Sequence, residues 1–327
     1  MRHYILIVSF FIFTNLHLSL AQEYKATELF AITWGDEANQ LKICPPDYED
    51  VDGTPEDSTD DMIWPCGGPT RAFVDNKENV YIDSYLFGHF KVFNSHGSLI
   101  LDLSKGSAGY NSEFFSSSPG DYVVDSNLLI YMISFPELTY VPVINLSGKL
   151  VDKLYPWGPD KQHEITNIQL NSNDIITFSC FDHYRTYREG KFYAGGSSGW
   201  LSRDGNYYVV IQDDERHLKF KKYGNPDNHG KAAWQEIKYV DLGKDMPIWD
   251  FMGVDDNMLL YVMFADANDV IKIRTYTIKY VMEDELIIHQ VINKYDLTMQ
   301  PFLRADGNIY EFRCLDDGLH VIRWSRH

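Results

Sequence analysis

The chain has 327 residues, of which 44% are hydrophobic and 15% aromatic, enough apolar material for a large buried core. Its 47 acidic side chains outnumber 29 basic ones, and the formal charge is −18 at pH 7. This charge disfavours nucleic acid and anionic membrane surfaces as partners, because both are negatively charged. Two explanations of the acidity stay open: it keeps an exported protein soluble, or it serves to bind cations or cationic polymers.

The N-terminus has the organisation of a cleaved signal peptide. Basic Arg2 precedes an apolar run from Tyr4 to Phe13, and the segment Ser19–Ala21 offers small residues at the −3 and −1 positions of a cleavage site. This run is shorter than the roughly 20 apolar residues that a membrane span needs, and so is every later stretch. We therefore expect residues 1–21 to be removed and residues 22–327 to form one secreted or periplasmic domain, without membrane insertion.

An acidic loop, residues 44–66, is bracketed by Cys44 and Cys66. The residues between them have no strand pattern, and export permits disulfides, so we predict a bridge that stabilises the fold by roughly 3 kcal/mol. The segment Asp50–Gly53 resembles the start of a calcium loop but lacks the spaced bidentate Glu. The loop is therefore either a solvated segment or a weak cation site.

A cassette recurs along the rest of the chain: a strand, a turn rich in Asp or Asn, and an apolar strand that usually carries a Tyr. Its six copies are 73–82, 122–131, 168–176, 201–208, 253–261 and 303–310. Most copies are spaced as expected for four-stranded propeller blades, which repeat every 40 to 50 residues or so. The shortest step runs from Ile176, in a copy without Tyr, to Tyr208. The pattern predicts an all-β, six-bladed β-propeller of four-stranded antiparallel blades.

The two ends of the chain complete the predicted ring. After the sixth cassette only Gly318–Trp324 remains for a strand, so the last blade lacks its outer strand. The segment Glu28–Trp34 has strand composition, and we expect it to fill this gap and remove the open edge. Within the blades, Asn94–Gly97 and Asn145–Gly148 predict turns between third and fourth strands.

Two cysteines test this geometry. Cys180 falls on the second strand of blade 3 and Cys314 on the second strand of blade 6. These blades are opposite in a ring of six, so we expect both thiols to be buried and reduced, because a disulfide needs Cα atoms within about 7 Å.

Blade 1 carries residues that resemble a known repeat. The segments Gly68-Pro69, Val74-Asp75, Asn79–Asp83 and Lys91–Phe93, with Gly97, are similar to the repeat of NHL-type six-bladed propellers. The resemblance is partial in blades 2 and 6 and faint in blades 3 to 5. It implies the fold, with turn-forming Gly, Asp and Asn and packing Tyr and Val, but no activity.

Propeller topology places the links between blades on the face opposite the Asp/Asn turns. Aromatic, imidazole and arginine side chains suit a binding surface on that face. The predicted ligand-binding residues are Arg71, Tyr85, His183, Arg185, Trp200 and Trp249. Trp200 and Trp249 have an alternative role as wedges between blades. The set favours a binding or interaction module for a protein, peptide or glycan.

A second hypothesis is a calcium-dependent hydrolase or lyase, by analogy with propeller lactonases and lyases that hold calcium or zinc in the channel. The candidate metal ligands are Asp83, Glu164, Asp182, Asp250 and Asp266. The metal-binding histidines of such lyases have no match in this chain. The sequence therefore predicts no catalytic residue, and calcium is its one candidate cofactor.

Overall fold

The computed structural model describes residues 24–43, 68–84, 88–104, 107, 119–134, 140–159, 165–180, 183–194, 199–214, 217–224, 234–241, 248–265, 270–289 and 299–327. Their regular structure consists of strands β1 to β24, which confirms the all-β prediction. Within those ranges no helix is long and apolar enough to cross a membrane.

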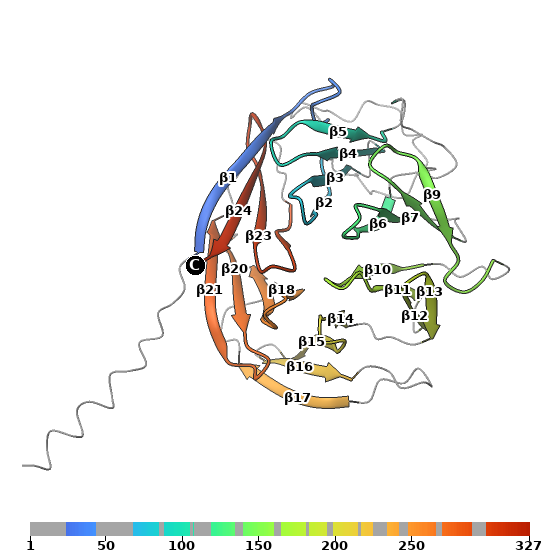
Figure 1. Ribbon diagram of the computed structural model, residues 1–327. Coiled ribbons are helices and arrows are strands. Elements are labelled where there is room, and N and C mark those ends of the chain that lie inside the picture. Colours follow the sequence, from blue (N-terminus) through green and yellow to red (C-terminus); the bar gives the residue numbers. More distant parts are fainter. Residues whose placement is uncertain are drawn as a thin grey trace, which may run out of the picture.

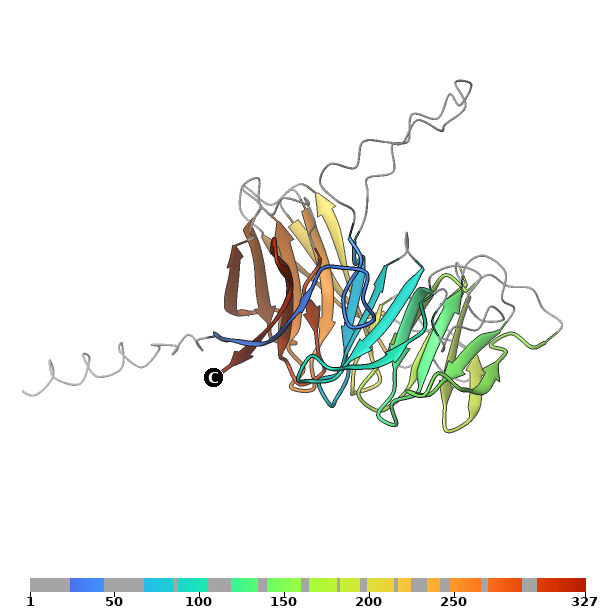
Figure 2. The same cartoon turned by 90° about the horizontal axis from the view of Figure 1, so that it is seen from above.

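The strands form six four-stranded sheets, arranged as the blades of a ring (Figure 1). Viewed from the side, the blades stand next to one another around it (Figure 2). Blade 1 comprises β2 (Arg71–Val74), β3 (Val80–Ser84), β4 (His89–Phe93) and β5 (Leu99–Asp102). Blade 2 comprises β6 (Pro119–Val124), β7 (Ile130–Ser134), β8 (Val141–Ile144) and β9 (Leu150–Leu154). Blade 3 comprises β10 (Asn167–Leu170), β11 (Ile176–Cys180), β12 (His183–Arg188) and β13 (Lys191–Ala194).

The second half of the ring is built in the same way. Blade 4 comprises β14 (Trp200–Leu201), β15 (Tyr207–Asp214), β16 (His217–Tyr223) and β17 (Trp234–Asp241). Blade 5 comprises β18 (Ile248–Val254), β19 (Leu260–Ala265), β20 (Val270–Tyr276) and β21 (Met282–His289). Blade 6 comprises β22 (Phe302–Leu303), β23 (Ile309–Cys314), β24 (Gly318–Arg326) and β1 (Tyr24–Thr33). The six-bladed prediction is confirmed.

The turn between the first and second strands is the same in every blade. The backbone N–H of Asp75 donates to the carbonyl oxygen of Asn79 at 3.1 Å. The residues that make the equivalent bond are Asp125, Asn171, Ser202, Asp255 and Arg304. Three positions later the backbone has a positive φ, which strains a non-glycine residue such as Glu78 (61°). The Asp75 side chain offsets this strain because its Oδ1 accepts hydrogen bonds from the N–H groups of Lys77 and Asn79.

The cassette tyrosines bond back to these turns. In three blades the hydroxyl donates to the aspartate six residues earlier, at 2.9–3.1 Å: Tyr81 to Asp75, Tyr131 to Asp125 and Tyr261 to Asp255. In blade 3 this position is Thr177, six residues after Asn171 and paired with Gln169. The alignment of Ile176 with the tyrosines of the other blades is therefore wrong by one residue. Blade 3 lacks the tyrosine that marks this position in the other blades. The short step beyond it reflects a two-residue turn at Glu189 and Gly190 and a link of only five residues between β13 and β14.

The turns predicted between third and fourth strands are present. Gly97 donates its N–H to the Asn94 carbonyl, and Gly148 donates to that of Asn145, both at 2.9 Å. Both glycines have positive φ, 77° and 74°. The glycine is thus required by the turn.

The N-terminal strand closes the ring. β1 pairs antiparallel with β24 from Tyr24↔Arg326 to Thr33↔Gly318, so both strands are longer than predicted. The added part of β1 includes exposed Lys25–Thr27, which gives no apolar pattern in the sequence. After β1, buried Lys91 of blade 1 donates from Nζ to the carbonyls of Ala38 and Gln40, at 3.0 and 2.6 Å. The N-terminal segment therefore fastens blade 6 to blade 1.

The two cysteines agree with the ring geometry. Cys180 lies on β11 and Cys314 on β23, the second strands of blades 3 and 6. Both are buried, and neither forms a disulfide. Burial raises the pKa of the Cys314 thiol to about 12, which keeps it protonated at neutral pH.

Candidate functional site: the central channel

The six inner strands surround a cavity of about 670 Å³ along the ring axis. The wall includes residues of β2, β6, β10, β14, β18 and β22, one strand from each blade. This volume is within the range of small-molecule sites, roughly 300–1,000 Å³. All inner strands run the same way along the axis, so the cavity has one mouth where they begin, here called the strand-start mouth, and one where they end, the turn mouth.

An ion pair joins two blades at the strand-start mouth. Arg71 of β2 contacts Asp121 of β6 through Nη1 and Oδ1 at 2.6 Å. The same Oδ1 accepts the N–H of Tyr122 at 2.8 Å, and Oδ2 lies 3.4 Å from the N–H of Ile168 on β10. Asp121 therefore connects blades 1, 2 and 3. Burial raises the pKa of its carboxyl, against the opposing effects of Arg71 and these N–H groups.

Asp83 is a second buried carboxylate beside this pair. It pairs in register with Arg71 across β2 and β3, and its Oδ1 accepts the hydroxyl of Thr70 at 2.7 Å. Burial raises the pKa of Asp83 to about 6, although the Thr70 hydrogen bond and Arg71 oppose the shift. Two carboxyl groups with raised pKa values around one arginine are typical of functional sites. Such groups can bind a polar ligand or transfer protons near neutral pH.

The middle of the channel is mainly apolar. Each inner strand contributes the residue that stands two positions before the first residue of its turn to the second strand, such as Phe73 before Asp75. These six residues, here called the waist, are Phe73, Val123, Gln169, Trp200, Gly253 and Phe302. The rings of Phe73 and Phe302 lie with their centroids 4.8 Å apart. A Cβ on Gly253 would lie 2.6 Å from the Trp200 indole. The ring of Trp200 thus occupies the space of the side chain that blade 5 lacks.

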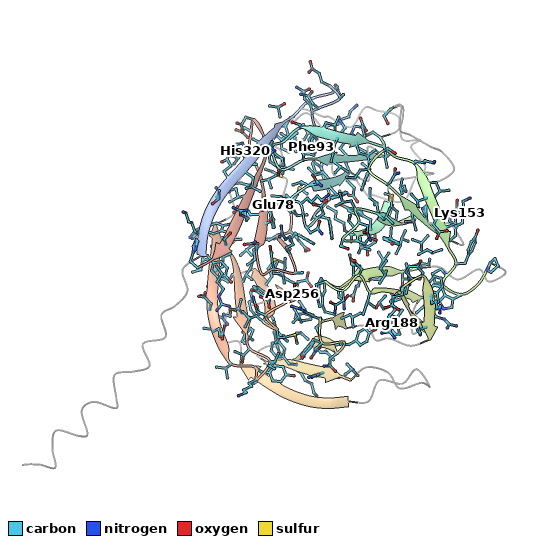
Figure 3. All side chains as sticks on the ribbon, viewed as in Figure 1. Glu78, Phe93, Lys153, Arg188, Asp256 and His320 are labelled. Atoms are coloured by element: carbon cyan, nitrogen blue, oxygen red, sulfur yellow. The ribbon has the colours of Figure 1, made fainter. Side chains whose placement is uncertain are left out.

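The turn mouth carries hydrogen bonds that cross between blades. Ser126 donates its N–H to Asp174 at 2.9 Å, and Asn173 donates to the Arg203 carbonyl at 3.1 Å. Glu78 accepts the hydroxyl of Tyr310 at 3.0 Å. These contacts join blades 2 and 3, 3 and 4, and 6 and 1, so this end of the channel holds the ring together. Figure 3 shows Asp256, at the same end, beside the centre of the ring.

The structure brings some of the predicted residues together. Arg71, Trp200 and Asp250 line the cavity, and Asp83 adjoins Arg71. Trp200 also packs against the apolar cluster between blades 4 and 5, as its wedge alternative predicted. Arg185, on the third strand of blade 3, is not among the cavity-lining residues.

Other predicted residues are placed only in part or not at all. The backbones of His183 and Trp249 lie on β12 and β18, but their side chains are outside the described set. The remaining candidates fall outside the described residues: Tyr85, Glu164, Asp182, Asp266, Cys44 and Cys66. Among the described side chains, no three His, Cys, Asp or Glu converge as a metal-binding group.

Sequence reasoning missed Asp121 and Gln169. Asp121 stands four residues before Asp125, as Arg71 stands four before Asp75. Opposite charges at one position of consecutive blades could have predicted the ion pair. Gln169 lines the cavity, and its Oε1 is buried without a hydrogen-bond partner in the described structure. A polar residue at a position that is otherwise mainly aromatic or apolar was its only signal.

No protein-family model matches the sequence, and no curated protein matches it significantly. Solved structures are similar in fold. A putative gluconolactonase shares 12% identity, with 94% of this chain and 96% of that chain covered and a TM-score of 0.50. A luciferin-regenerating enzyme shares 9% identity over 79% of this chain and 91% of that one, with a TM-score of 0.48. A gluconolactonase from Xanthomonas campestris shares 10% over 79% and 86%, with a TM-score of 0.46. The chain has the β-propeller fold.

Proposed function

We propose that the protein is an exported binding module whose ligand, from a protein, peptide or glycan, inserts into the channel through the strand-start mouth. The observation that carries this proposal is the group of Arg71, Asp83 and Asp121, which interrupts the blade repeat at the cavity opening. Burial makes Asp83 costly to keep ionised, and carboxyl groups with such shifted pKa values gather at functional sites. We also propose an NHL-type repeat, because Asp75 and Tyr81, which belong to that resemblance in blade 1, have bonded counterparts in blades 2 and 5.

Ligand-observed NMR with a fragment library of neutral, anionic and cationic compounds tests the proposal. Fragments that bind the channel should change in affinity in Arg71→Gln and in Asp121→Asn, because each change removes half of the ion pair at the opening. Asp152→Asn is the matched control: it makes the same charge change on β9, the outer strand of the blade that contains Asp121. Hits that bind all variants equally would contradict the proposal.

The second candidate is a hydrolase or lyase, with calcium as its possible metal. A carboxyl group with a pKa of about 6 is suited to general acid–base catalysis, and Asp83 has such a pKa. The name of the putative gluconolactonase suggests a lactone as the first substrate to try. Lactone hydrolysis that requires calcium and is lost in Asp83→Asn would favour this candidate, and hydrolysis at the uncatalysed rate would leave the binding module.

A further inference from the structure

We infer that the channel ligand presents an organic cation: an ammonium group on an apolar, preferably aromatic, body. This inference rests on the proposed function, because it concerns the ligand of the same channel. It is carried by two features of the cavity wall: aromatic rings at the waist and a hydrogen-bond acceptor, the Oε1 of Gln169, that lacks a donor.

The waist supplies apolar surface and aromatic rings. Phe73 and Phe302 contact each other, and Trp200 contacts Gly253 of the next blade. All three rings line the cavity and are partly exposed. Because Trp200 lies against backbone, its ring is held in place before a ligand arrives. Aromatic rings attract cations through their electron-rich faces, and Trp does so most strongly.

Gln169 supplies an acceptor within this ring of residues. Its Oε1 is buried, and no described group donates a hydrogen bond to it. A buried amide oxygen without a donor costs free energy that a donor on the ligand would recover. An ammonium group carries only donors, so it matches this atom.

The charges of the wall have the complementary sign. Its arginines are Arg71, Arg203 and Arg304, and its aspartates are Asp75, Asp121, Asp125, Asp174, Asp250, Asp256 and Asp306. Arg71 is already paired with Asp121, and Arg304 with Asp306 and Tyr310. An anionic ligand that enters by the strand-start mouth would therefore have to displace Asp121 from Arg71, whereas a cation meets the carboxylates of Asp121 and Asp250 there. The acidity of the whole chain acts in the same direction.

Three probes of similar size separate charge from shape: 2-phenylethylamine, 2-phenylethanol and 3-phenylpropionate. Calorimetric or NMR titration of the intact protein should give at least tenfold tighter binding for the amine than for the other two. Equal binding of amine and alcohol, or tighter binding of the carboxylate, would overturn the inference while leaving a ligand-binding channel. Failure of all three to bind would also overturn it, and the fragment screen above would then decide the proposed function separately.

Variants locate the site. Gln169→Leu should weaken amine binding about tenfold and change alcohol binding less, because it removes the acceptor and keeps the volume. Trp200→Leu should weaken both probes, and melting curves of each variant report whether it folds. Asp152→Asn should leave amine affinity within twofold. An amine that binds Gln169→Leu and Trp200→Leu as tightly as the wild type is bound elsewhere on the acidic surface, and this result would refute the assignment.

Discussion

The two ends of the channel are built on different principles. At the turn mouth every blade makes the same backbone bond, starting from Asp75 in blade 1, and side chains such as Glu78 and Asp174 link neighbouring blades. At the strand-start mouth the corresponding positions differ from blade to blade, with Arg71 facing Asp121. Residues that repeat around the ring are explained by folding, so the residues that interrupt the repeat are the better candidates for function.

The largest effect is expected from opening the ring, because both mouths of the channel need a closed ring. Deleting Tyr24–Trp34 removes β1 and exposes the edge of β24. We expect a loss of more than about 4 kcal/mol, seen as the absence of a cooperative thermal transition. Deleting only residues 22–23 is the control and should leave the melting temperature unchanged. A native melting temperature without β1 would disprove ring closure as a source of stability.

The next largest effect is expected at the turn mouth. Asp75→Ala removes the acceptor for Lys77 and Asn79 N–H groups and for the buried hydroxyl of Tyr81. Urea unfolding should show a loss of about 3 kcal/mol, because buried donors are left without partners. Asn76→Ala, at an exposed position of the same turn, should cost less than about 0.5 kcal/mol. Equal effects of the two changes would mean that the repeated aspartate is not structural.

The same contrast explains what the sequence could predict. The fold could be predicted because each blade repeats a local sequence pattern. Asp75 and Tyr81 indicate a turn and the side-chain hydrogen bond that stabilises it, and both can be recognised within one blade. The blade count and the closure by β1 followed from that repetition. The site was less accessible because Asp121 and Gln169 matter through neighbours in other blades, and Arg185, with suitable chemistry, lies outside the cavity wall. Residues that occur once and contact each other only in the folded chain produce no repeating pattern in the sequence.

A smaller change in the free energy of unfolding, of opposite sign, is expected for a substitution at the strand-start mouth. The pKa of Asp83 is about 6 in the folded chain against an ordinary 3.8, so the folded state binds the proton more tightly. Stability from this group is therefore fully present below pH 3.8 and is lost as pH rises through 6, by up to about 3 kcal/mol. Asp83→Asn should remove this loss and make the protein about 2 kcal/mol more stable at pH 7.5.

Urea unfolding of wild type and Asp83→Asn at pH 4.5, 6 and 7.5 measures the difference, which should grow with pH. Carboxylates that do not interact with Asp83 titrate equally in both proteins and cancel, so the difference reports Asp83 together with its neighbour Asp121. A variant that is less stable than the wild type at pH 7.5 would show that the Asp83 carboxylate supports folding, and the two ends would then not differ in the way proposed.

The smallest effect concerns a contact that joins blades at the turn mouth without being buried. Ser126 of blade 2 donates from N and Oγ to Asp174 of blade 3, and both residues also line the cavity. Ser126→Ala keeps the backbone bond and removes only the exposed hydroxyl, so unfolding should cost less than about 1 kcal/mol. Binding of 2-phenylethylamine should not change, because the ligand is expected to enter from the other end. Weaker amine binding in Ser126→Ala with unchanged stability would reverse the assignment of the two mouths, since the repeated end would then be the one that contacts the ligand.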